Sequence, residues 1–172
     1  MTKQEYYLLK LIVSEGEIRG RKRLQKLFYL LQYIGCPIEY RFIMHYYGPY
    51  SPDLALQVDS LVEKGLIQED ISIEIKYRAT EKGSAEINTI DSIDANKAVV
   101  EEVSGWASIF RHLDNNTATD LEISSTILFW MDWGRNKEDA IKATSAQKKK
   151  PSESAIKITE YATKQKNACY RS

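Results

Sequence analysis

The sequence lacks the segments that mark membrane and secreted proteins. It has no apolar run of about 18 residues and no charged-then-apolar N-terminal segment, so we expect neither a membrane span nor a secretory signal. Its two cysteines, Cys36 and Cys169, are far apart and outside any CxxC or Cys/His spacing. This arrangement favours reduced thiols over a disulfide or a metal site. We therefore expect a cytoplasmic protein.

The motifs of the common enzyme classes are also missing. His45 and His112 are the two histidines, and neither lies in an HExxH motif, near a cysteine pair or beside a GxSxG motif. Phosphate-binding loops of the GxxxxGK or GxGxxG type are absent as well. We expect no catalytic residues, no cofactor and no bound metal, and hence a protein that is not an enzyme.

What remains is an ordinary globular composition with an uneven distribution of charge. The 172 residues are 43% hydrophobic and 28% charged, enough for one core or for two small ones that share an interface. The net charge is zero. Residues 1–50 nevertheless hold 8 Lys/Arg and 4 Asp/Glu, residues 91–134 hold 2 and 8, and residues 135–172 hold 10 and 4. Such opposite blocks can pair within one molecule or between two.

Apolar residues at helical spacing predict a mostly helical chain. The strongest signal in the N-terminal half is the series Leu24, Leu27, Phe28, Leu31 and Ile34. Further signals at the ends of segments are N-cap residues, such as Thr80, and glycines that follow a helix. The predicted helices cover residues 3–15, 21–34, 52–64, a segment starting at 80, the seam 99–113, and residues 117–133, 136–146 and 153–167.

Two segments have the composition of strands. Residues 38–47 are rich in aromatic and β-branched side chains, and residues 66–79 alternate as a short β-wing would. The order helix, helix, extended segment, helix, wing resembles a winged helix. We therefore predict an α+β, mostly α fold, with a winged-helix-like half over 1–84 and a helical bundle over 85–172 packed on it.

The segment His45–Leu54, which we call the tyrosine corner, is the first candidate site. Pro49 fixes its own φ, and Ser51 and Pro52 are typical of an N-cap and a first helical position, so a helix begins here at a fixed angle. Tyrosine rings can be buried and still offer a hydroxyl, which suits a docking surface or a packed joint. The candidate partner-binding residues at this corner are His45, Tyr46, Tyr47 and Tyr50.

A basic cluster at the start of the helix 21–34 is the second candidate. Cations at a helix N-terminus oppose the helix dipole, so their presence suggests a role in capturing an anion or an acidic protein surface. The alternative is pairing with Glu15, Glu17 or the acidic middle region. Gln25 and Lys26 lie on the predicted polar side of the helix, where simple solvation also explains them. The residues of this cluster are Arg19, Arg21, Lys22, Arg23 and Lys26.

Several of these motifs together resemble a known prokaryotic family. The run from Gly20 to Leu30 with its Leu-Gln-Lys-Leu core, the Tyr-Gly-Pro-Tyr-Ser sequence at 47–51 and the Gly-Leu-Ile at 65–67 are similar to the YwgA-like proteins. They more distantly resemble the Panacea (SocA-like) antitoxin domain. The resemblance implies a compact, non-enzymatic regulatory or antitoxin-like module, and for the YwgA-like branch it implies no activity.

These observations lead to two functional hypotheses. The first is a regulatory module, antitoxin-like, that contacts a protein through the tyrosine corner and the basic helix start. The alternative is a winged-helix DNA-binding regulator acting as a homodimer. The predicted recognition helix argues against it, because Asp53, Asp59 and Glu63 would face a polyanion. Under the alternative, the contacts would instead come from the basic cluster and the lysines at 148–150.

Overall fold

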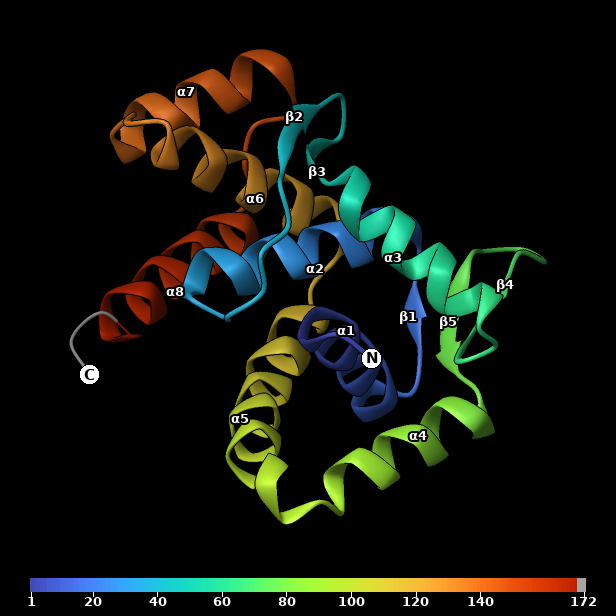
Figure 1. Cartoon of the computed structure of the whole chain (residues 1–172). Coiled ribbons are helices and arrows are strands. Elements are labelled where there is room, and N and C mark those ends of the chain that lie inside the picture. The colour runs from blue at the N-terminus through green and yellow to red at the C-terminus, as the bar shows by residue number, and fades with distance from the viewer. Residues whose placement is uncertain (170–172) are drawn as a thin grey trace.

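Two helices near the N-terminus lie at the centre of the computed structural model, which describes residues 1–169 (Figure 1). Helix α1 packs mainly against α5, and α2 packs against α6, α8 and α5. The helices are α1 (Lys3–Glu15), α2 (Arg21–Ile34), α3 (Pro52–Glu63), α4 (Glu81–Asp91), α5 (Lys97–Asp114), α6 (Ala118–Asp132), α7 (Lys137–Gln147) and α8 (Glu153–Cys169), with a 3-10 turn η1 (Asp94–Asn96). The predicted mostly α, α+β class is confirmed.

The strands form two small antiparallel sheets. One has the order β1-β5-β4, with Ile18 opposite Tyr77 and Ile67 opposite Ala79. The other is the β2–β3 hairpin. The strands are β1 (Ile18–Arg19), β2 (Ile43–His45), β3 (Gly48–Tyr50), β4 (Ile67–Asp70) and β5 (Lys76–Ala79). The expected hairpin over 66–79 is present, whereas the winged-helix assignment stays a prediction.

Local capping explains where most helices begin. Ser51 Oγ accepts the Leu54 N–H at 3.2 Å and Thr80 Oγ1 accepts the Gly83 N–H at 3.0 Å, as the sequence predicts. Proline at the first helical position and Asp53 in the first turn add to the signal at α3. Element boundaries set by such local chemistry agree with the expected ones.

The main core contains residues from both halves of the chain. Helix α2 is buried from Leu24 to Leu31, and α6 is buried from Leu121 to Phe129. Phe28 of α2 and Phe110 of α5 meet edge to face, with ring centroids 5.7 Å apart. The proposed boundary near residue 84 stays a prediction. Within residues 1–169, no helix is both long and apolar enough to cross a membrane.

Candidate binding site at the tyrosine corner

The tyrosine corner begins at the last residue of β2 and continues through β3 into the start of α3 (Figure 1). The chain reverses at Tyr46 and Tyr47, between the paired residues His45 and Gly48. Gly48 has φ +84°, which fits the hairpin type in which a two-residue turn is followed by a left-handed glycine. The expectation of one extended segment over 38–47 was therefore wrong: only residues 43–45 of it form a strand.

Gly48 also lets the hairpin approach α6 closely. A Cβ at this position would lie 2.7 Å from Thr126 Oγ1 and 3.4 Å from the Glu122 carbonyl oxygen. Both the backbone conformation and the space therefore require glycine here. The hairpin is held against α6 on this side and against α2 on the other.

Gln25 of α2 joins the corner through its side-chain amide. Its Nε2 donates to the Ser51 carbonyl oxygen at 3.0 Å, and its Oε1 accepts the Ser51 N–H at 2.8 Å. Gln25 is only 4% exposed. The amide thus satisfies both backbone groups of a fully buried residue, and Ser51 in turn caps α3.

Lys26 holds the next part of the corner. Its Nζ donates to the Pro49 carbonyl oxygen at 2.5 Å, and the side chain is 2% exposed. The alternative that Gln25 and Lys26 are simply solvated does not hold, because the corner covers that face of α2. Consecutive residues of the Leu-Gln-Lys-Leu motif therefore fix the Tyr-Gly-Pro-Tyr-Ser segment by hydrogen bonds to its backbone.

A carboxylate shared by two lysines closes the site from α6. Glu122 Oε2 accepts from Lys22 Nζ at 2.8 Å, and Oε1 accepts from Lys148 Nζ at 2.5 Å. Lys148 Nζ also donates to the Tyr46 carbonyl oxygen at 2.8 Å. Burial raises the pKa of Glu122, but the two lysines outweigh that effect and leave the pKa below its ordinary value. Glu122 is therefore ionised at neutral pH.

The arginines of the basic cluster are engaged within the molecule. Arg19 pairs with Glu17 at 2.6 Å, and Arg21 pairs with Glu69 at 2.8 Å. Arg23 donates to the Asp114 carboxylate and to the carbonyl oxygens of Asp114 and Asn116 at the end of α5. These three arginines therefore follow the alternative in which the basic cluster pairs with carboxylates of the same chain.

The aromatic residues at the hairpin tip are the exposed part of the site. Tyr46 is 80% exposed and Tyr47 is 53% exposed. Their rings meet edge to face, with centroids 4.9 Å apart, and Lys22 Nζ lies 5.3 Å from the centroid of Tyr47. His45 is exposed beside the half-buried Tyr50, with ring centroids 5.6 Å apart.

A small cavity of about 240 Å³ lies between α2 and the hairpin, with walls that are mostly carbon. Six of the nine predicted site residues line it, whereas Arg19, Arg23 and Tyr46 do not. In the part of the chain that the structure describes, no group of His, Cys, Asp or Glu residues is arranged to hold a metal ion. The residues lining the cavity are Arg21, Lys22, Gln25, Lys26, His45, Tyr47, Gly48 and Tyr50.

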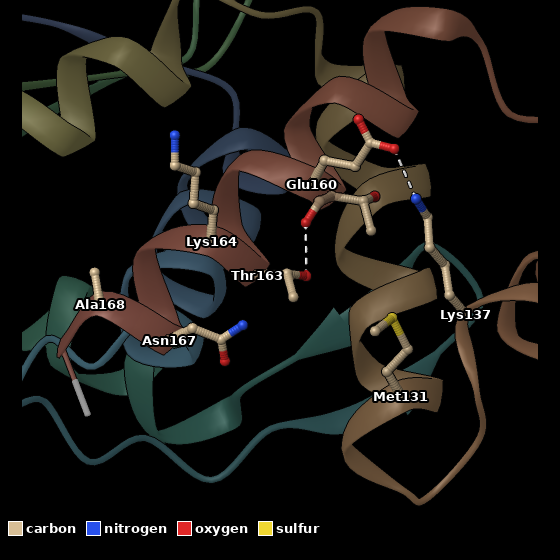
Figure 2. Close-up of a pocket in the computed structure, with 8 residues that line it drawn as sticks. Met131, Lys137, Glu160, Thr163, Lys164, Asn167 and Ala168 are labelled. Carbon is tan, nitrogen blue, oxygen red and sulfur yellow. Dashed lines mark hydrogen bonds and ion pairs between the residues drawn. The ribbon is translucent and has the colours of Figure 1, made fainter. Parts of the chain in front are cut away.

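A larger hollow of about 750 Å³ lies along α8, beside the end of α6 (Figure 2). Lys137 and Glu160 form a 2.7 Å ion pair across its upper edge in this view, and Thr163 Oγ1 donates to the Thr159 carbonyl oxygen. Its remaining walls include Met131 and Ala168. The side chains of Lys164 and Asn167 also line it.

Comparison with known proteins identifies the family. No family model matches the chain. The uncharacterized protein YwgA of Bacillus subtilis (strain 168) is 31% identical over 156 residues, which cover 86% of this chain and 88% of that protein. The chain belongs to the YwgA-like family. Membership of the YwgA-like family brings no activity with it, because this relative is itself uncharacterized. The more distant link to the Panacea domain stays a prediction.

Three residues that help to build the site were not predicted as site residues from the sequence. Glu122 and Thr126 lie in a helix whose apolar content predicts only burial, and Lys148 begins a lysine run that we interpreted as a solvated loop. The available signals were one carboxylate between apolar residues, Glu122 between Leu121 and Ile123, and one proline-bounded lysine run. Neither signal indicates that residues 22, 122 and 148 would meet.

Proposed function

We propose that the protein is a non-enzymatic regulatory module that binds a protein partner through the tip of the β2–β3 hairpin. The proposal rests on one contrast: the side chains at the hairpin tip are exposed, whereas the backbone around them is held by hydrogen bonds. Tyr46 and Tyr47 are exposed, while Gln25, Lys26 and Lys148 hydrogen-bond to the backbone around them. The antitoxin-like character is the part that depends on the Panacea resemblance.

Rigid aromatic side chains are effective anchors in protein interfaces. Tyrosine offers a large apolar area and a hydroxyl at low cost in side-chain entropy, and anchors of this kind dominate many interfaces. A hairpin whose backbone is already held in place loses little further entropy on binding. Lys22 beside the Tyr47 ring adds a polar rim to the aromatic tip.

The DNA-binding alternative receives less support from the charges. The exposed positions of α3 include Asp53, Asp59 and Glu63, which would repel phosphate. The arginines of the basic cluster already pair with carboxylates of this chain. A protein surface is therefore the better-supported partner.

Site-specific photocrosslinking in the native cytoplasm tests the proposal. A photoreactive amino acid replaces Tyr46 in one variant and Ile73 in a matched control. Ile73 is fully exposed at the turn between β4 and β5, so both positions offer an accessible side chain in a hairpin turn. We expect a discrete crosslinked protein from position 46 that does not appear from position 73.

A second substitution establishes that the tyrosines themselves are recognised. Tyr47→Ser in the position 46 variant should reduce the yield of the crosslinked protein at least tenfold, because it removes one of the two aromatic anchors. Ile71→Ser, a matched change at another exposed apolar residue, should leave the yield unchanged. Identical crosslinking patterns from positions 46 and 73 would contradict the proposal.

A further inference from the structure

Lys26 has hydrogen-bonding capacity that the protein does not use. An ammonium group carries three donors, and among residues 1–169 the Pro49 carbonyl oxygen is the one acceptor that Lys26 Nζ reaches. The side chain is 2% exposed, so bulk water does not supply the missing partners. Within the same residues, it takes part in no ion pair. A buried charge in this condition is unfavourable unless something else pairs with it.

The cavity beside Lys26 has the shape and chemistry to admit such a partner. The rings of His45, Tyr47 and Tyr50 line it, and basic side chains enter from α2. No carboxylate of the described chain lines it. At about 240 Å³ it lies below the usual range of roughly 300 to 1,000 Å³ for drug-sized ligands, so a fitting ligand is about the size of one ring with a small substituent.

We propose that this cavity is a binding site for a small organic anion, a flat ring bearing a carboxylate or phosphate, whose charged group pairs with Lys26. The ring would stack among the aromatic walls, and the anion would accept the unused donors of Nζ. The cavity shares Tyr47 with the hairpin tip, but the proposal does not depend on the proposed protein partner, since it rests on Lys26 and the cavity behind the hairpin.

The charges around Lys26 support this assignment. Burial lowers the pKa of Lys26 to about 7; Glu122 on α6 opposes the shift, and Lys148 after α7 and Lys22 on α2 add to it. Arg21 and His45 also line the cavity. Since the two lysines already neutralise Glu122, an incoming anion meets a net positive site. Its binding should draw a proton onto Lys26 at mildly alkaline pH.

Isothermal titration calorimetry with benzoate as the probe tests the site. We expect saturable binding to the intact protein and binding at least tenfold weaker for benzamide, which has the same shape without the charge. Titrations at about pH 8 in Tris and in HEPES, two buffers with different ionisation enthalpies, should show uptake of close to one proton for each benzoate bound. Absence of benzoate binding or equal binding of benzamide would each overturn the proposal.

Variants locate the binding in the cavity. Lys26→Met should weaken benzoate binding at least tenfold, and Tyr47→Ala should weaken it several-fold by removing one wall. Tyr47 is half exposed, so its variant keeps the test valid if Lys26→Met does not fold. Lys149→Met, a change at an exposed lysine outside the cavity, should have no effect. Unchanged affinity in both cavity variants would also overturn the proposal. Crosslinking at the hairpin tip is a separate measurement, so the two proposals can fail independently.

Discussion

At the scale of single residues, Lys26 makes the site sensitive to pH. Its ammonium group is buried against the Pro49 carbonyl oxygen, with burial as the main cause of its lowered pKa of about 7. An unfolded chain would hold this proton up to about pH 10.4, the ordinary lysine value. Between these two pH values the unfolded state binds more protons than the folded state, so stability rises with pH.

Lys26→Met should remove this contribution while keeping a side chain of similar length. The free energy of unfolding of the natural protein minus that of the variant should therefore increase by roughly 2 kcal/mol between about pH 7 and 9. Urea denaturation at several pH values measures the difference. The contributions of Cys36 and the buried tyrosines to the pH dependence are the same in both proteins, so they cancel in this difference. A constant difference across this range would show that Lys26 keeps its proton in the folded state.

At the scale of elements, Glu122 connects α2, α6 and the segment after α7. One carboxylate accepts from Lys22 and from Lys148, and the side chain is 11% exposed. Breaking a buried ion pair leaves the other charges without compensation, which makes such a change far more harmful than the loss of an exposed pair.

Glu122→Gln should therefore lower the free energy of unfolding at pH 7 by on the order of 3 kcal/mol. Glu160→Gln is a matched control, since Glu160 pairs with Lys137 at the surface and should change stability by less than about 1 kcal/mol. Because the folded pKa of Glu122 is lowered, its stabilising contribution is lost as pH falls through that value. The effect of Glu122→Gln should accordingly shrink in acid, and chemical denaturation at neutral and acidic pH measures it. Equal losses of stability in Glu122→Gln and Glu160→Gln would contradict the role of Glu122 as the buried partner of two lysines.

The boundaries of the helices were predictable, whereas the contacts that build the site were not. Ser51 and Thr80 cap their own helices through neighbours three residues away, so the sequence contains the whole interaction. Gln25 and Lys26 instead bond to a backbone 23 and more residues away, and the helical pattern places their polar side chains outside. The turn at Tyr46 has no Asn-Gly signal either.

At the scale of the whole molecule, the opposite charge blocks of the sequence pair inside one chain. Arg23 from the basic N-terminal block binds Asp114 at 2.9 Å, and Lys166 from the basic C-terminal block binds Asp132 at 2.8 Å. Lys10 pairs with Asp91 in the same way. Much of the positive charge that would attract a polyanion is therefore compensated within the molecule.

This compensation predicts weak binding to DNA. Against mixed duplex DNA across a salt series, we expect affinity no tighter than the weak end of the non-specific range, roughly 10⁻⁴ M, with a shallow dependence on salt because few phosphates are neutralised. Lys149→Glu/Lys150→Glu changes two exposed lysines that follow Lys148 in the sequence and should leave this weak binding nearly unaltered. Micromolar binding that falls steeply with salt and disappears in the double variant would instead favour a DNA-binding regulator. In that case the contact surface would be the lysine segment after α7, because the arginines at the start of α2 are held by carboxylates of this chain.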